Sequence, residues 1–221
     1  LHSSPPRRSS DLLEALAKRG GGALEGGKGI YWLARIEERL GDSAKAQARY
    51  REVATKYPFS WYALLAHTRL AKAGIALGPF GDATGAKGPK LAADVDPALA
   101  TDDLIVRADE LIAAGLGIDA GLELERDERG FLKRHDRAKA FAILLDRYRK
   151  AGNYNRPYEL ADSYSGGALD GPASGDARRW WENAYPRAYR DLVEKYQALG
   201  KNPEGYLYSI MRKESAFDPH N

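Results

Sequence analysis

Apolar residues recur at intervals of three and four positions along most of this chain, the spacing that places them on one face of an α-helix. The clearest stretch lies between Gly29 and Gly41, where the recurring residues are Ile30, Leu33, Ile36 and Leu40. Glycine or proline follows several such stretches and predicts where the helices end. The same period predicts helices over 46–57, 61–70, 104–112, 119–132 (or 120–132), 140–148 and 158–164. Ser60 and Asp136 are expected to cap the helices that follow them. No run alternates as a strand would. The chain is therefore expected to be all-α.

The first helices have the residue spacing of a tetratricopeptide-like hairpin. The matching leucine, small, alanine, aromatic and proline positions are Leu33, Ala34, Ala46, Tyr50 and Pro58. Small residues let two antiparallel helices approach, and the aromatic ring fills the space to the next pair. Because such hairpins stack into a curved solenoid, we expect an α-superhelix over 29–178. Residues 1–28, which open with serine, proline and arginine, are expected to be a disordered tail or added sequence.

The composition is that of a soluble globular protein and excludes several other classes. Charged residues make up 29% of the chain and hydrophobic residues 43%, which are ordinary proportions. Lys and Arg number 34 against 31 Asp and Glu, and the net charge of +3 is too small for a dedicated nucleic-acid-binding protein. No stretch approaches the roughly 20 apolar residues that span a bilayer. The absence of cysteine excludes disulfides, thiolate zinc sites and a cysteine nucleophile.

Four further features are interpreted as structural. The four histidines share no metal-ligand spacing, so neither a metal nor a cofactor is expected. The glycine-rich segment 78–89 lacks the lysine–serine ending of a phosphate-binding loop and is interpreted as a connection between helices. The run from Trp180 to Tyr185 could stack on bases or sugars, but helix packing at a domain junction is favoured. The mixed-charge run Glu123–Arg137 is interpreted as a solvated helix face.

The last predicted helix runs from Gly205 to Glu214. Asn202 before it suits a helix cap, and Pro203 suits the first helical position. Along the helix, one stripe contains residues at relative positions 0, 3, 4 and 7, which are Leu207, Ile210, Met211 and Glu214. Seven residues make nearly two turns, so the carboxylate of Glu214 shares a face with apolar residues.

A carboxylate in this position has two interpretations. Burial favours the neutral acid, and an acid that stays protonated near neutral pH can cleave a glycosidic bond by general acid catalysis. Alternatively, Glu214 lies at a frayed helix end and pairs with a nearby cation, which the spacing alone favours. Arg212 and Lys213 are expected on the exposed polar face of the same helix.

One set of residues near the end of the sequence forms a recognisable pattern: Ala184-Tyr185-Pro186, Tyr189, Asn202-Pro203 and Ile210-Met211-Arg212-Lys213-Glu214-Ser215-Ala216-Phe217-Asp218-Pro219. This pattern resembles the soluble lytic transglycosylases of bacteria. In that family the catalytic domain opens with tyrosine–proline and carries its acid/base glutamate in a Glu-Ser-Ala-Phe/Trp-Asp/Asn-Pro motif at a helix end. A long α-superhelix precedes that domain. The resemblance therefore implies that residues 179–221 are the truncated start of a lysozyme-like α domain.

The resemblance also implies a reaction, the cleavage of the β-1,4 bond between N-acetylmuramic acid and N-acetylglucosamine in peptidoglycan. Glu214 would protonate the leaving oxygen and then act as base on the muramyl 6-hydroxyl, which attacks the anomeric carbon and leaves a 1,6-anhydromuramyl end. Ser215 would support the glutamate or the substrate by hydrogen bonding, and Asp218 is assigned no role. No second catalytic carboxylate is evident, as in the glycosidases that depart from the usual carboxylate pair. The expected partners are glycan strands, with the superhelix as a surface for other cell-wall proteins, and the expected location is the periplasm or cell envelope.

Part of the family pattern has no counterpart in these residues. The glycine–alanine–x–glycine–leucine–methionine–glutamine segment and the later tyrosine of the substrate groove are not found. Since the single methionine is Met211, we expect the sequence to be part of a longer protein. The 221 residues alone are expected to fold but to be inactive, with the Leu207–Ile210–Met211 stripe exposed and Glu214 solvated.

Two other functions fit parts of the same sequence. A non-enzymatic tetratricopeptide-like scaffold explains residues 30–165 but leaves the Glu214 segment unexplained. A hydrolytic lysozyme would share the helix and the glutamate but would activate water with another carboxylate. The products distinguish the three functions, because a transglycosylase leaves anhydro ends, a hydrolase leaves reducing ends and a scaffold leaves none.

Overall fold

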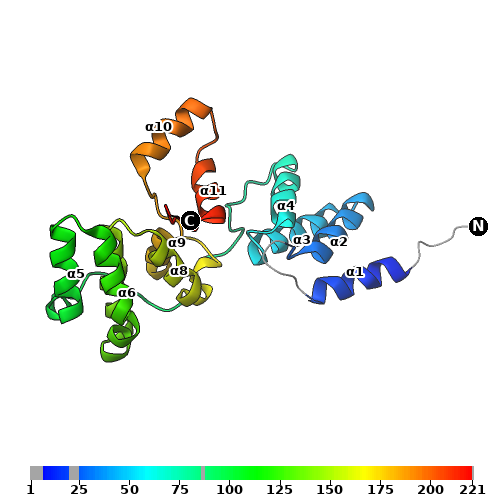
Figure 1. Ribbon diagram of the computed structural model, residues 1–221. Coiled ribbons are helices and arrows are strands. Elements are labelled where there is room, and N and C mark those ends of the chain that lie inside the picture. Colours follow the sequence, from blue (N-terminus) through cyan, green and yellow to red (C-terminus); the bar gives the residue numbers. More distant parts are fainter. Residues whose placement is uncertain (1–6, 20–24, 86–87, 221) are drawn as a thin grey trace, which may run out of the picture. The chain divides into compact units, whose positions relative to one another are not determined.

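The computed structural model describes residues 7–19, 25–85 and 88–220, and every regular element within these ranges is helical (Figure 1). The predicted all-α class is confirmed for this part of the chain. Within the same ranges, no helix is both long and apolar enough to cross a bilayer.

The chain divides into two compact units. The first comprises Leu1–Thr84 with Asp170–Pro172, and the second comprises Gly85–Leu169 with Ala173–Asn221. The division falls inside the 29–178 segment that was predicted to be one superhelical domain. Residues 179–221, which carry the resemblance to transglycosylases, belong to the second unit together with the helices that precede them.

In its described residues, the first unit has four helices that pack in chain order. Its core lies between the second, third and fourth helices and includes Tyr31, Tyr50 and Leu70. Ser60 caps the last of them, as predicted, by accepting the Ala63 N–H at 3.0 Å. The helices are α1 (Arg7–Arg19), α2 (Lys28–Arg39), α3 (Ser43–Lys56) and α4 (Trp61–Lys72).

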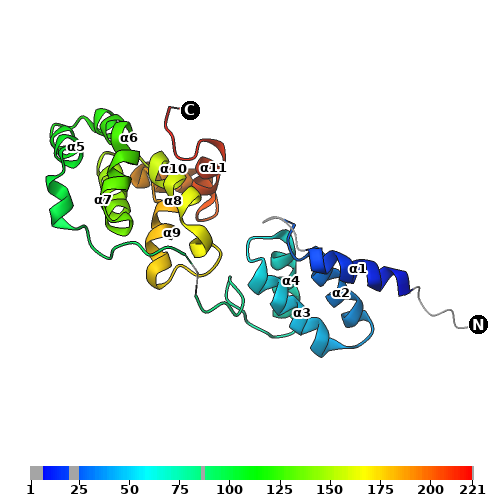
Figure 2. The ribbon, with the colours of Figure 1, turned by 90° about the horizontal axis from the view of Figure 1, so that it is seen from below.

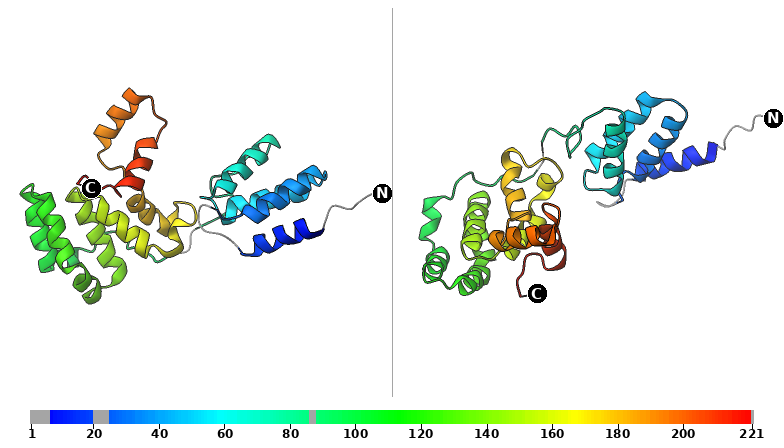
Figure 3. Two further views of the ribbon diagram at one scale, coloured as in Figure 1. Left: turned by 45° about the vertical axis from the view of Figure 1, so that its right-hand side comes forward. Right: turned by 90° about the horizontal axis from the view of Figure 1, so that it is seen from above.

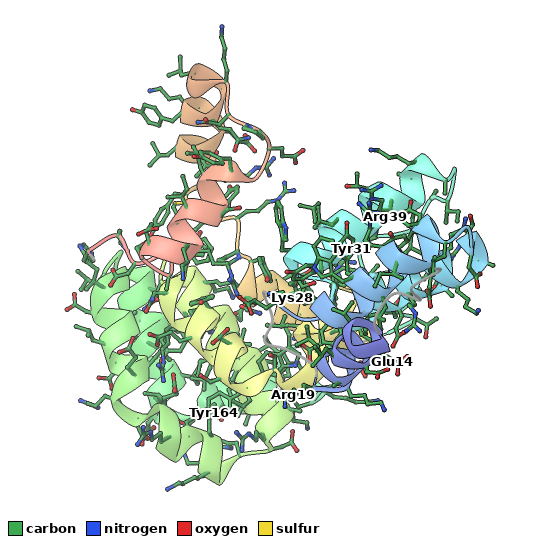
Figure 4. The ribbon with its side chains drawn as sticks, turned by 90° about the vertical axis from the view of Figure 1, so that its right-hand side faces the viewer. Glu14, Arg19, Lys28, Tyr31, Arg39 and Tyr164 are labelled. Atoms are coloured by element: carbon green, nitrogen blue, oxygen red, sulfur yellow. The ribbon has the colours of Figure 1, made fainter. Side chains whose placement is uncertain are left out.

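The first helix lies within residues 1–28, for which the sequence predicts a disordered tail or added sequence. Arg7–Arg19 are helical, so the expected disorder is wrong for this part, while residues 1–6 and 20–24 lie outside the described ranges. This helix, α1, packs beside α2. Figure 4 labels Glu14 and Arg19 on α1 and Tyr31 on α2. Gly29 permits the approach, because a Cβ at this position would meet the backbone of Ala17. The apolar residues on the packed side are Leu13, Leu16 and Ala17, each partly buried at helical spacing.

The second unit contains seven α-helices and three short 3₁₀ turns in its described residues. Figures 2 and 3 show the helices following one another, with the last two forming a hairpin beside α8 and α9. The α-helices are α5 (Asp103–Ala113), α6 (Gly117–Arg134), α7 (Arg137–Lys150), α8 (Asn155–Tyr164), α9 (Arg178–Ala184), α10 (Arg190–Gly200) and α11 (Tyr206–Glu214). The 3₁₀ turns are η1 (Pro97–Thr101), η2 (Gly166–Leu169) and η3 (Gly175–Ala177).

The helices α7 and α9 supply much of the core of the second unit. Trp180 is fully buried and donates its indole N–H to the Pro89 carbonyl at 2.7 Å, which confirms the helix-packing interpretation for this tryptophan. Asp136 caps α7 as predicted, accepting the Lys139 N–H at 3.1 Å. The apolar spacing predicts that five residues are buried between helices, namely Leu33, Tyr50, Leu65, Leu111 and Leu145. Leu33, Tyr50 and Leu145 are buried, whereas Leu65 and Leu111 are only partly buried.

Truncating Leu145 to alanine is expected to lower the free energy of unfolding by about 2–5 kcal/mol, because apolar contacts are lost and a cavity remains. Leu145 is 2% exposed, whereas Leu122 of the same unit is 61% exposed and provides the matched control. Urea unfolding of both variants measures the difference. Equal midpoints for Leu145→Ala and the parent protein would show that Leu145 is not in a packed core.

Candidate functional site

The helix that carries the predicted acid is α11, which begins later than the sequence predicts. Its N-terminal flanking residue is Gly205, whose φ of 78° lies in the left-handed region and suits glycine. Asn202 was the expected cap, but its backbone N–H donates to the Gln197 carbonyl at 3.2 Å and so completes the end of α10. The cap prediction is therefore wrong, because Asn202 belongs to the preceding turn.

Glu214 is the last residue of α11 and is exposed. Among the described residues, no hydrogen bond or ion pair involves its carboxylate. The apolar stripe on the same helix is also open, with Ile210 41% exposed and no residue of α11 fully buried. The structure thus has the solvated glutamate expected for the 221 residues alone, and neither a cation-paired helix end nor a buried acid. Of the stripe that was expected to be exposed, Ile210 is exposed and Leu207 and Met211 are partly buried.

Ser215, the predicted supporting residue, forms hydrogen bonds within the C-terminal end of α11. Its backbone N–H and its hydroxyl both donate to the Met211 carbonyl, at 3.1 and 3.2 Å. The structure places no hydrogen bond between Ser215 and Glu214. Ser215 therefore satisfies a free carbonyl of the last turn, as helix ends require.

The two residues after Ser215 form a strained turn. Ala216 and Phe217 have φ values of 49° and 66°, a region that residues with a side chain rarely adopt. Strain of this kind costs about 1–3 kcal/mol per residue and persists only where the surroundings enforce it. The Phe217 N–H donates back to Met211 at 3.3 Å, and the Asp218 N–H donates to Ser215 at 2.9 Å.

Neighbouring helices hold this turn in place. The Phe217 side chain is 2% exposed and meets the Tyr158 ring edge-on at 6.0 Å. Asn155, at the start of α8, donates its side-chain N–H to the Ala216 carbonyl at 3.1 Å. Tyr189, directly before α10, donates its hydroxyl to the Phe217 carbonyl at 3.4 Å. Contacts from two other parts of the unit thus stabilise the turn that follows Glu214.

Arg212 is not on an exposed face, and the prediction that it would be is wrong. Its side chain is half-buried, and its guanidinium lies 4.5 Å from the centre of the Tyr185 ring and 5.0 Å from that of Tyr158. Its Nε–H also points at the Ala184 carbonyl, at 3.3 Å. Lys213, the next residue, is exposed as predicted.

Sequence reasoning did not identify the residues that hold α11. Asn155 and Tyr158 lie about sixty positions before Glu214, on a helix whose pattern indicates only a short amphipathic element. The one usable signal was the tyrosine content of the segments on either side of the glycine-rich break at 165–175. Clustered tyrosines and an arginine are typical of cation–π stacks.

Two hollows flank the α10–α11 hairpin. One, of about 520 Å³, has a mixed polar and apolar lining from both helices and includes Gln197 and Tyr208, whose Oε1 and hydroxyl are buried without a partner among the described residues. The other, of about 540 Å³, is almost wholly apolar and includes Leu207, Ile210 and Met211. Within the described ranges, no group of acidic and histidine side chains could hold a metal ion.

Comparison of the chain with protein-family models, with curated proteins and with solved structures gives no match.

Proposed function

We propose that this chain is the helical scaffold and the opening part of the catalytic domain of a peptidoglycan lytic transglycosylase, with Glu214 as its acid/base residue. The observation that carries the proposal is that the family's sequence motif and a suitable local geometry coincide at Glu214. The Glu-Ser-Ala-Phe-Asp-Pro sequence begins on the last residue of α11. The carboxylate there is exposed and has no partner among the described residues, while the turn after it is fixed.

A free carboxylate on a fixed turn suits proton transfer to a bound sugar. A general acid must lie within hydrogen-bond reach of the atom that it protonates, so its carboxylate cannot be committed to an ion pair. At the same time, catalysis requires the group to be held in place. The Phe217 ring and the hydrogen bonds from Asn155 and Tyr189 fix the backbone on one side of Glu214.

In the proposed reaction, the protonated Glu214 gives its proton to the glycosidic oxygen, and the bond from that oxygen to the muramyl anomeric carbon breaks. The Glu214 carboxylate then takes the proton of the muramyl 6-hydroxyl, whose oxygen bonds to the anomeric carbon. One residue thus supplies and recovers one proton, and no water is consumed. Asp218, the nearest acid in sequence, accepts the His220 N–H at 2.8 Å and is engaged in its own turn.

The arrangement of the other helices is compatible with the proposed scaffold. Consecutive α-helices pack as neighbours from α1 to α4 and from α5 to α9, and the tetratricopeptide-like positions Leu33, Ala34, Ala46 and Tyr50 are buried in α2 and α3. Stacked hairpins of this kind offer long surfaces for partners. We therefore propose glycan strands as the substrate, the periplasm or cell envelope as the location, and other cell-wall proteins as partners of the helical region.

Digestion of purified sacculi by the whole gene product tests the proposal. A transglycosylase releases soluble muropeptides, whereas a tetratricopeptide-like binding scaffold releases none. A hydrolytic lysozyme also releases muropeptides, but their ends are reducing sugars. The absence of release under any condition in which the protein is folded would contradict the proposal.

The 221-residue chain by itself is expected to fold and to show no activity on sacculi. Its helices are stabilised by their neighbours within each unit, but positioning of the sugar requires the groove segments that have no counterpart in this sequence. Circular dichroism and muropeptide release measure the two properties. Release of muropeptides by a pure preparation of this chain would show that the site is complete within these residues.

A further inference from the structure

The helix α11 has little core packing of its own to fix its direction. None of its nine residues is fully buried, and the apolar stripe of Leu207, Ile210 and Met211 borders an open hollow. The orientation of the helix must therefore come from other contacts. Apart from its packing on α10, the contacts of α11 that the described residues show lie at its end, where Arg212, and Phe217 just after the helix, meet α8 and the end of α9.

Arg212 lies in a stack of planar groups contributed by three helices. Its guanidinium is between the rings of Tyr158 from α8 and Tyr185 from the end of α9. The Tyr185 ring stacks in turn on Trp181, with centres 4.8 Å apart and planes at 18°. Trp181 donates its indole N–H to the Ala168 carbonyl at 3.1 Å. The stack thus connects α11 to the core of the unit.

The contacts of Arg212 require a guanidinium. Cation–π contacts with two rings use a planar, delocalised cation that is more weakly hydrated than an ammonium group. No carboxylate among the described residues pairs with Arg212, although the chain has many acidic residues, so aromatic faces and one carbonyl are its partners. A lysine would keep the charge but could not stack on both rings at once.

Arg212 does not act on Glu214 by direct contact. Residues two positions apart on a helix point in different directions, and no contact joins the two side chains. The effect of Arg212 must pass through the backbone of the last turn. That turn continues into the strained Ala216–Phe217 pair, which Asn155 and Tyr158 of α8 hold in place.

We propose that Arg212, held between Tyr158 and Tyr185, is a positioning residue that sets the direction of the last turn of α11 and hence the place of the Glu214 carboxylate. This inference rests on the proposed function. A shift of about 1 Å in a catalytic group can lower the rate by about 10²-fold. Loss of the stack is therefore expected to lower kcat while leaving KM nearly unchanged.

The test uses the whole gene product and purified glycan strands, with kcat and KM measured for Arg212→Met and Tyr185→Leu. We expect kcat to fall by about 10–100-fold in each, with KM within about twofold. The double variant should be no slower than Arg212→Met, because Arg212→Met already removes the contact between Arg212 and Tyr185. Tyr185→Phe retains the ring and should retain kcat. If the hydroxyl of Tyr185 were required instead of its ring, kcat would fall in this variant.

Two control variants separate positioning from charge and from general stability. Lys213→Met removes an exposed cation next to Glu214 without touching the stack, and is expected to keep kcat. Leu104→Ala removes a fully buried side chain on α5, and should lower the unfolding midpoint while keeping kcat at temperatures where the protein is folded. If Arg212→Met does not fold, the comparison of kcat between Tyr185→Leu and Tyr185→Phe tests the inference in its place.

Three results would overturn the inference. The first is a kcat of Arg212→Met equal to that of the parent protein. The second is a fall of kcat in Lys213→Met as large as that in Arg212→Met. The third is a fall of kcat in Leu104→Ala in proportion to its loss of stability. Each leaves the proposed function intact as long as Glu214→Gln is inactive. If Glu214→Gln is active, the proposed function fails on its own account.

Discussion

Replacing Glu214 by glutamine is expected to lower the rate of glycan-strand cleavage by about 10²–10⁴-fold or more, the usual contribution of general acid–base catalysis. The amide has the shape of the carboxyl group but can neither give nor take the proton. The fold should be unaffected, because Glu214 is exposed and has no hydrogen bond or ion pair among the described residues. Initial rates of muropeptide release and thermal unfolding of the same preparation measure the two effects.

A matched control for this variant is Glu182→Gln on α9. Glu182 is also partly exposed but pairs with Arg178 four residues earlier, a surface contact of the helix. Its replacement should leave the rate of cleavage unchanged. Release of anhydromuropeptides by Glu214→Gln at close to the parental rate would show that this glutamate is not the acid.

Replacing Arg156 by alanine is expected to lower the free energy of unfolding by about 3–5 kcal/mol, the cost of leaving a buried charge without its partner. The Glu128 side chain is 4% exposed and accepts two N–H groups of Arg156, at 2.7 and 3.0 Å. It also accepts the Tyr148 hydroxyl at 2.8 Å. Burial and the Glu128 carboxylate raise the pKa of Tyr148 well above its ordinary value, so that its hydroxyl remains a donor.

Denaturant unfolding measures this loss, and two further variants identify its cause. Arg178→Ala breaks an exposed pair and should cost less than about 1 kcal/mol. Adding Glu128→Gln to Arg156→Ala should recover part of the lost stability, because the buried group is then neutral. Equal midpoints for Arg156→Ala and the parent protein would mean that Glu128 is not held as a buried carboxylate.

The helices could be predicted because their information is local. The three- and four-residue period places α2, α3, α4, α5 and α7 close to their observed bounds, and the capping side chains Ser60 and Asp136 fix where two of them begin. Apolar spacing also identifies the buried faces, as at Leu33 and Leu145. These properties depend on residues within one or two turns of each other.

The partners of charged side chains could not be predicted in this way. The run Glu123–Arg137 was interpreted as a solvated helix face, yet Glu128 within it is 3% exposed. Its burial depends on Arg156, which is 28 positions away. Arg212 likewise meets Tyr185 and Tyr158 from other helices. A single sequence states which residues share a helix face but not which element that face will meet.

The candidate site likewise has one part that the sequence predicts and one part that depends on tertiary packing. The motif identifies Glu214 and places it at a helix end, and α11 does end at that residue. The left-handed turn at Ala216 and Phe217 has no sequence signal, since neither residue favours that backbone region. It depends on Asn155, Tyr158 and Tyr189, which tertiary packing brings to it.

The measurement that tests the central proposal most directly is the mass of the muropeptides that the whole gene product releases from sacculi in ¹⁸O-labelled water. Intramolecular attack by the 6-hydroxyl consumes no water, so the proposal predicts muramyl ends that lack one water and carry no label. The release of these ends should be lost in Glu214→Gln. Reducing ends that contain ¹⁸O would contradict the proposal, because they would show that water attacks the anomeric carbon.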